Sequence, residues 1–184
     1  DFTSAGADLF LRTARAARAI PALLPLTKAA GGYRCKHPGW GLIDPRTSQP
    51  IDPQRLASNE LIEMSDWEAQ DFAVQAVVEQ LQKQGKQVFS HQSYLDVDPS
   101  IWFQDERGAA WVVLRTVRYP VAEAAQPGNI AAIRRQCASQ SNRGFFASVA
   151  LANANDPFDS SPTSPMPLYR GHGMYVRFEG LRAV

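Results

Sequence analysis

Cysteine is scarce in this chain of 184 residues, and the two that occur, Cys35 and Cys137, lie far apart in the sequence. Because so few cysteines cannot form a disulfide framework, we expect a protein of the reducing cytoplasm. Long apolar runs are missing too, since none approaches the ~20 residues that cross a bilayer. No signal-peptide pattern occurs in these residues. The sequence therefore predicts a cytoplasmic protein with no membrane partner.

A strong excess of either charge is also absent, because 19 basic residues nearly balance 18 acidic ones. The charge is unevenly distributed: residues 65–128 hold 5 basic and 9 acidic side chains, whereas residues 129–184 hold 6 and 3. The chain is thus not a strongly basic domain, although its outer parts could form a nucleic-acid-binding surface. Its hydrophobic content of 45% is enough to bury a core.

Several catalytic motifs do not occur in the sequence. It contains no Gly-x-Ser-x-Gly elbow, no His-Glu-x-x-His helix and no dinucleotide-binding fingerprint. Cys35 and His37 could bind zinc, but a structural site needs four ligands and no paired spacing supplies the others. Cys137 shares a helical pattern with Ile133, which favours a core position. A reactive thiol activated by Arg134 is the alternative.

The first 64 residues are predicted to form a helix followed by a loop-rich extension. Apolar residues recur at helical spacing over residues 7–20, and Pro21 ends the pattern. Residues 31–58 are rich in glycine and proline, which predicts irregular structure with a short hairpin near residues 33–43. Three arginines of the helix form either a phosphate-facing surface or a solvated face, of which the solvated face is commoner: Arg12, Arg15 and Arg18.

Residues 65–184 show the pattern of an α/β core. Ser65 and Glu68 have the spacing of a capping box, which predicts a helix that ends at Gly85. Strands are predicted at 87–94, 101–103 and 110–117, the last two joined by a hairpin turn from Asp105 to Gly108. A helix follows at 129–140, then strands at 145–151 and 173–178, with a Ser/Pro-rich loop at 160–167. We therefore expect a central mixed β-sheet of about four or five strands flanked by helices, in a chain that is one compact unit overall.

This order of elements resembles the PD-(D/E)xK superfamily, also called restriction-endonuclease-like, as do the segments Asp98-Pro99-Ser100-Ile101 and Trp111 to Thr116. In that superfamily a Pro-Asp opens the second strand, and an acid-x-lysine follows about 14 residues later, at the end of the third. Two carboxylates hold Mg²⁺ beside the scissile phosphate, and the lysine offsets developing charge. The resemblance covers about residues 65–151 and implies a restriction-endonuclease-like core.

The residues at the motif positions are mostly not metal ligands. Pro99 matches the proline, but Ser100 occupies the position of the aspartate. Leu114 and Thr116 occupy the positions of the second acid and the lysine. Since leucine has no ligand atom and serine alone is a poor ligand for Mg²⁺, we expect a catalytically degenerate domain without a cofactor. Such a domain would bind nucleic acid or a protein partner.

Two other functions stay open. The chain could be an active Mg²⁺-dependent phosphodiesterase or nuclease with a relocated site, in which Asp98, Glu68 and Arg115 are catalytic and Asp96 and Asp98 bind the metal. The resemblance allows this arrangement, because a glutamate of the preceding helix sometimes joins the metal site in the superfamily. Alternatively, the chain is a structural or interaction module, such as a homodimer.

Binding of DNA or RNA would require basic residues in the second half of the chain. The resemblance implies that the helix at 129–140 faces phosphates, which makes Arg134, Arg135 and Arg143 candidates because arginine forks match phosphate oxygens. Arg170 and His172 alternate with glycines and are further candidates. The alternatives are a solvated helix face and a turn that leads into an edge strand.

Overall fold

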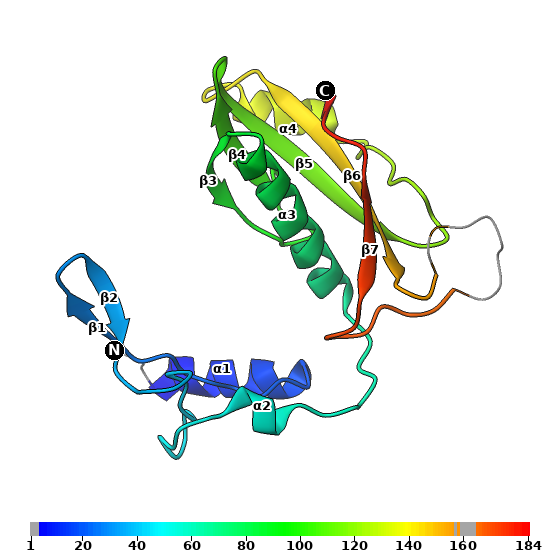
Figure 1. The fold of residues 1–184 in the computed structure, drawn as a ribbon. Helices are drawn as coiled ribbons and strands as arrows, with labels where there is room; N and C mark the ends of the chain where they lie inside the picture. The colour runs from blue at the N-terminus through cyan, green and yellow to red at the C-terminus, as the bar shows by residue number, and fades with distance from the viewer. Residues whose placement is uncertain (1–3, 157, 159–164) are drawn as a thin grey trace. The chain divides into compact units, whose positions relative to one another are not determined.

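The computed structural model describes residues 4–156, 158 and 165–184, so most of the predicted Ser/Pro loop at 160–167 lies outside the described residues. The chain divides into two compact units, Asp1–Glu60 and Leu61–Val184, four residues before the predicted boundary. No helix among the described residues is both long and apolar enough to cross a membrane. Each unit is built around different elements (Figure 1).

The N-terminal unit contains two helices and one small hairpin. Its elements are α1 (Ser4–Ala16), β1 (Leu26–Ala29), β2 (Gly32–Cys35) and α2 (Pro53–Leu56). The hairpin pairs β1 with β2, so the prediction of a hairpin near residues 33–43 was wrong in position. Gly31 and Gly32 have φ values of 91° and 144°, which only glycine adopts readily, and they place the turn there.

Helix α1 ends four residues before the predicted end because its last turn forms a Schellman motif. The N–H of Ala19 donates to the carbonyl of Ala14 at 2.8 Å, and the N–H of Arg18 donates to that of Arg15 at 3.0 Å. Arg18 takes the left-handed position with φ 49°. The predicted apolar face was also wrong in part, because Leu9 is 62% exposed.

The C-terminal unit is a mixed sheet with one helix on each face. Its strands lie in the order β3-β4-β5-β6-β7, and β8 also pairs with β6. Strands β5 and β6 are parallel and all other pairs are antiparallel, which confirms the predicted mixed sheet, with six strands in place of four or five. The elements are α3 (Asp66–Lys83), β3 (Gln87–His91), β4 (Ile101–Asp105), β5 (Gly108–Arg118), α4 (Ile130–Cys137), β6 (Gly144–Asn153), β7 (Met174–Phe178) and β8 (Arg182–Ala183).

Local sequence signals position helix α3 and the β4–β5 hairpin. The Ser65 hydroxyl accepts the N–H of Glu68, and the Glu68 carboxylate accepts the N–H of Ser65, so the predicted capping box is confirmed. Gly85, with φ 75°, follows the end of the helix. Asp105 pairs with Gly108 across the hairpin, which confirms the predicted turn.

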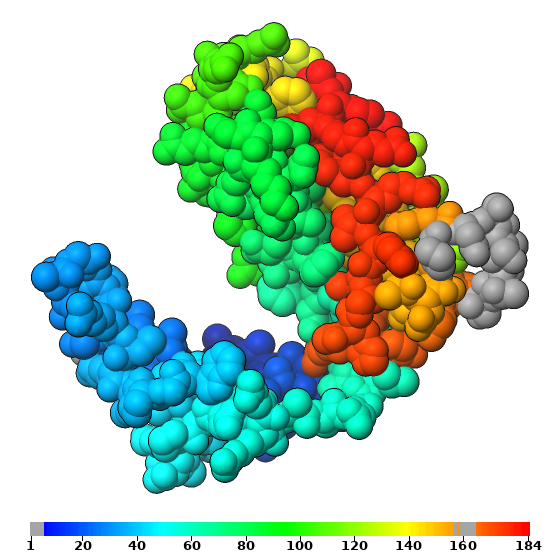
Figure 2. All heavy atoms as spheres, viewed as in Figure 1, coloured from blue at the N-terminus to red at the C-terminus, as the bar shows by residue number. Residues whose placement is uncertain are grey.

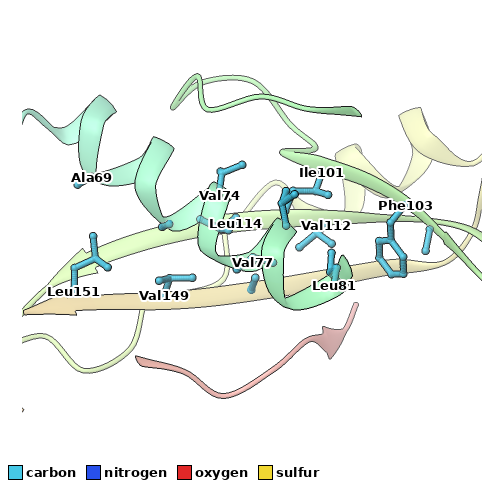
Figure 3. Close-up of a cluster of buried hydrophobic side chains, with 14 of the residues drawn as sticks. Ala69, Val74, Val77, Leu81, Ile101, Phe103, Val112, Leu114, Val149 and Leu151 are labelled. Carbon is cyan, nitrogen blue, oxygen red and sulfur yellow. The ribbon is translucent and has the colours of Figure 1, made fainter. Parts of the chain in front are cut away.

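Alternate residues of β5 face two separate cores, because successive side chains of a strand point to opposite faces. Val112 and Leu114 pack in the larger core under α3, where Figure 3 shows them beside Val74 and Val77. Trp111 packs in the smaller core with Ile133 and Cys137 of α4. In the space-filling view, the residues of β7 lie beside α3 on the surface of this unit (Figure 2). Because α3 covers the larger core and α4 covers the smaller one, the two helices lie on opposite faces of the sheet.

Candidate functional site

The positions that would carry catalysis in the resembled superfamily lie in the interior of the C-terminal unit. Ser100 precedes β4, is 1% exposed, and its Oγ accepts the N–H of Leu114 at 3.3 Å. Leu114 is in the middle of β5 and has no exposed surface. Its side chain belongs to the core under α3, so this position is occupied by packed hydrocarbon.

A buried glutamine of α3 completes a neutral network around these positions. The Nε2 of Gln70, a residue 2% exposed, donates to the carbonyl of Leu114 at 3.1 Å. The hydroxyl of Thr116 donates to the Oε1 of Gln70 at 2.7 Å. The side chains of Gln70, Ser100 and Thr116 are thus neutral and hydrogen-bonded inside the protein. The carbonyl of Leu114 also accepts from NH1 of Arg115, at 2.9 Å.

The network does not fit a divalent metal ion. Mg²⁺ requires several oxygen ligands, at least some of them carboxylates. The position of the second acid is a leucine, and the hydroxyls of Ser100 and Thr116 already form hydrogen bonds inside the protein. In the part of the chain that the structure describes, no group of three or more His, Cys, Asp or Glu side chains is placed to hold a metal.

The sequence also singled out Asp98 and Arg115, and the structure joins these two residues in a bidentate ion pair. The guanidinium NH1 and NH2 of Arg115 donate to the two carboxylate oxygens of Asp98 at 2.9 and 2.6 Å. The carboxylate side chain is only 9% exposed. Arg115 lies between Leu114 and Thr116 in β5, so its side chain projects toward the α4 face and away from α3.

Glu68, the third residue of the relocated site, is engaged on the other face. Its carboxylate caps α3 and forms an ion pair with Arg170, whose NH2 donates to Oε2 at 3.1 Å. Burial raises the pKa of Glu68, but the hydrogen bonds from Arg170 and Ser65 outweigh it, so the pKa lies below its ordinary value. The structure therefore brings Asp98 and Arg115 together and places Glu68 elsewhere. Asp96 is exposed in the turn between β3 and β4.

Cys137 is a core residue. It is 4% exposed and packs with Ile133 and Trp111. Burial, and then the negative charge of Asp98, raise the pKa of the Cys137 thiol. The alternative of a thiol activated by Arg134 is wrong, because activation requires a lowered pKa.

Of the arginines predicted to bind nucleic acid, two have structural roles. Arg143 donates to both carboxylate oxygens of Asp105 at 2.7 Å and to the carbonyl of Gly108 at 2.9 Å, which fixes the β4–β5 hairpin to the start of β6. Arg170 holds the N-terminus of α3 through Glu68. Neither guanidinium is free to bind a ligand without loss of these contacts.

Three other candidates are exposed at the surface. Arg134 and Arg135 lie on α4, and neither forms an ion pair with another described residue. His172 is also exposed, and its ring lies 5.8 Å from that of Tyr169. These residues are available to a partner in solution.

We expect Asp105→Asn to lower the free energy of unfolding by about 2 kcal/mol at pH 6, because it removes the carboxylate from two charge-assisted hydrogen bonds. The hydrogen bonds of Arg143 lower the pKa of Asp105 from 3.8 to about 2, despite some burial. A lowered folded pKa means that the stabilisation is complete above pH 3.8 and is lost as the pH falls toward 2.

Urea unfolding at pH 6 and pH 3 measures this effect, and the difference between wild type and variant should be smaller at pH 3. Glu106→Gln, a change at the exposed neighbouring position, is the matched control and should have little effect. A difference that is the same at both pH values would contradict the assigned role of the ion pair.

Charge in the C-terminal unit is segregated between the segment that contains α3 and the segment that contains α4. Residues 61–106 hold 9 acidic and 2 basic side chains, whereas residues 107–155 hold 6 basic side chains and one acid, Glu123. That acid is paired with Arg182. Three of the six basic side chains, Arg115, Arg118 and Arg143, are paired with acids of residues 61–106. The exposed positive charge on α4 is that of Arg134 and Arg135.

Comparison with known proteins places this unit in a family. A family model described as a domain of unknown function (DUF8840) matches residues 67–184. The chain belongs to this family. The match begins within α3 and covers the whole sheet of the DUF8840 domain. It includes the neutral network and the ion pairs of Asp98 with Arg115 and of Asp105 with Arg143. Comparison with curated proteins and with solved structures found no match.

Proposed function

We propose that the DUF8840 domain of this chain is a catalytically silent relative of the PD-(D/E)xK nucleases that binds the backbone of a nucleic acid. The observation that carries the proposal is the neutral network of Gln70, Ser100 and Thr116 around Leu114. Ser100, Leu114 and Thr116 are the positions where a nuclease would have its acids and lysine. A binding domain does not need them and gains stability when they are replaced by satisfied neutral groups.

The order of elements supports the proposed kinship. Helix α3 precedes β3, the hairpin of β4 and β5 follows, and Pro99 stands directly before Ser100 at the opening of β4. Ser100 and Leu114 are joined by a hydrogen bond, so the two motif positions are adjacent in space as they would be in a metal site. This layout supports the proposed kinship, although the metal ligands are replaced.

The segregation of charge supports the α4 side as the binding surface. Arg134 and Arg135 are exposed on α4, and Glu123 is the only acid in residues 107–155. Arginine is suited to phosphate because its planar fork donates two parallel hydrogen bonds. Neither Arg134 nor Arg135 forms an ion pair with another described residue.

A gel-shift titration of the full chain with a DNA duplex at several salt concentrations tests the proposal. We expect Arg134→Ala/Arg135→Ala to weaken binding about tenfold or more, because two charge-assisted contacts are lost. The slope of log K against log salt should become shallower by about 2, since each phosphate contact contributes about 0.9.

Lys83→Ala/Lys86→Ala is the control for net charge, because it removes the same charge at the last residue of α3 and three residues beyond it. These lysines are paired with Glu79 and Asp105. The control should leave affinity and salt slope almost unchanged. Equal losses in both variants would show general charge attraction without an α4 surface, and would contradict the proposal. A chain that binds no duplex but grows in size with concentration would support the interaction module instead.

A further inference from the structure

Three arginines converge on an open hollow within the N-terminal unit. The hollow has a volume of about 580 Å³ and is lined by one stripe of α1, the segment that follows it, and Arg46. Arg12 and Arg15 belong to the stripe, while Arg46 comes from a turn far along the sequence. The positive charge therefore comes from two elements that fold against one space.

The α1 wall of the hollow has helical spacing. Asp8, Leu11, Arg12 and Arg15 lie three or four residues apart and so share one face of the helix. The buried Ala14 points elsewhere, so these arginines are not held against the interior of the unit. The carbonyl end of a helix repels anions, but here the Schellman motif engages the carbonyls of Ala14 and Arg15.

The opposite wall is a turn whose backbone is fixed by hydrogen bonds. The carboxylate of Asp44 accepts the N–H groups of Arg46 and Thr47 at 2.8 and 2.9 Å. The N–H of Ser48 donates to the carbonyl of Asp44 at 2.8 Å. These N–H bonds lower the pKa of Asp44. The turn is held by the backbone N–H of Arg46, so none of these hydrogen bonds involves its guanidinium.

None of the three guanidiniums forms an ion pair with an acid in the described part of this unit, although the charge of Asp44 acts on Arg46. The ion pairs of the unit involve other residues, Arg18 with Glu60 and Arg55 with Asp52. Arg12 forms only a hydrogen bond of its Nε to the carbonyl of Asp8, at 3.4 Å. Asp8 is the one acid that lines the hollow, so the lining has a net charge of +2 from three arginines and one aspartate.

We propose that this hollow binds the phosphate groups of a nucleotide, with Arg12, Arg15 and Arg46 as the phosphate ligands. Arginine forks pair with phosphate oxygens. A volume of about 580 Å³ falls within the ~300–1,000 Å³ of small-molecule sites. The same hollow is lined by Leu11, Ala19 and Pro21, which give a base or sugar an apolar surface next to the arginines. The nucleotide is either free, as a nucleoside diphosphate, or one unit of a nucleic-acid chain.

The site lies outside the segment matched by the DUF8840 family and does not rest on the function proposed for that domain. Arg134 and Arg135 belong to the other unit. Pyrophosphate binding by the hollow can therefore be measured in the Arg134→Ala/Arg135→Ala variant, where it should be unchanged. Failure of duplex binding at α4 would leave the pyrophosphate result intact.

Calorimetric titration of the full chain with pyrophosphate, with ADP and with a short single-stranded DNA tests the proposal. We expect Arg12→Gln/Arg15→Gln and Arg46→Gln each to weaken binding about tenfold or more, because charge-assisted hydrogen bonds are lost from opposite walls. Arg46→Lys should retain only part of the affinity, since lysine keeps the charge but lacks the fork. All these side chains are exposed, so the fold should survive.

Arg34→Gln is the matched control, because it removes one exposed arginine of the same unit from β2, away from the lining of the hollow. It should change affinity less than twofold. Binding of ADP and pyrophosphate assigns the site to a free nucleotide, and binding of DNA alone assigns it to a nucleic-acid chain. No binding of any probe, or an equal loss in Arg34→Gln, would overturn the proposal.

Discussion

Gln70→Glu is expected to lower the free energy of unfolding by about 3 kcal/mol at pH 7, and by much less at pH 4. The new carboxylate would be almost fully buried and would face the carbonyl of Leu114, which now accepts from the amide. Burial and this carbonyl together raise the pKa of the carboxyl group by about 2 units. Each pKa unit corresponds to ~1.4 kcal/mol. Protonated, the group donates to Leu114 as the amide does.

The direction of the pH dependence follows from this raised pKa. In the unfolded chain a glutamate titrates near 4.3. A higher pKa in the folded state means that the variant approaches wild-type stability below about pH 4 and becomes less stable as the pH rises toward the folded pKa. Urea unfolding from pH 4 to pH 7 measures the change.

Gln70→Met is the matched control for this experiment. It keeps the length of the side chain but removes the amide from the carbonyl of Leu114, which retains NH1 of Arg115, and leaves the hydroxyl of Thr116 without its acceptor. We expect a loss of about 2 kcal/mol that does not depend on pH. If Gln70→Glu has the same stability at pH 4 and pH 7, the position is hydrated and the network is not closed.

Gly144→Ala is expected to destabilise the C-terminal unit by about 3 kcal/mol, through overpacking against an immobile ring. A Cβ at Gly144 would lie 2.2 Å from two ring atoms of Trp111. The ring has no exposed surface, and its Nε1–H donates to the carbonyl of Ser141 at 3.1 Å, so it cannot move aside without loss of packing and of this bond. Thermal and urea unfolding measure the loss.

Two further variants separate this clash from a general effect of alanine. Gly128→Ala, where nothing lies within 4 Å of the added Cβ, should be nearly neutral. Trp111→Leu should reduce the cost of Gly144→Ala, because the residues are in contact and their effects should not add. If the two losses of unfolding free energy add fully in the double variant, the alanine does not act through Trp111. That result would contradict the packing of Trp111 on Gly144.

The sequence was informative where local chemistry decides the structure. The capping box of Ser65 and Glu68 and the turn after Asp105 correctly predicted the start of α3 and the β4–β5 hairpin. The N-terminal unit was predicted less well because its elements are short and depend on backbone conformation. No apolar periodicity marks the left-handed Arg18 or the turn at Gly31.

The candidate site was predicted in part for a similar reason. The motif alignment led to Ser100, Leu114 and Thr116. Of the proposed substitutes, Asp98 was chosen because it lies just before the strand, and Glu68 because the resemblance allows a glutamate of the preceding helix. Strand alternation separates them, because Asp98 pairs with Arg115 on the α4 face. Gln70 was missed, although a polar residue on the buried stripe of α3 was a visible signal.

Incubation of the full chain with supercoiled plasmid and Mg²⁺ or Mn²⁺ tests the central claim most directly, namely that the nuclease positions have become a neutral hydrogen-bonded network. The account predicts that the plasmid stays supercoiled and that Ser100→Ala makes no difference. Metal-dependent cleavage that is abolished by Asp98→Ala would contradict it, because catalysis would then depend on a carboxylate that the structure places in an ion pair with Arg115.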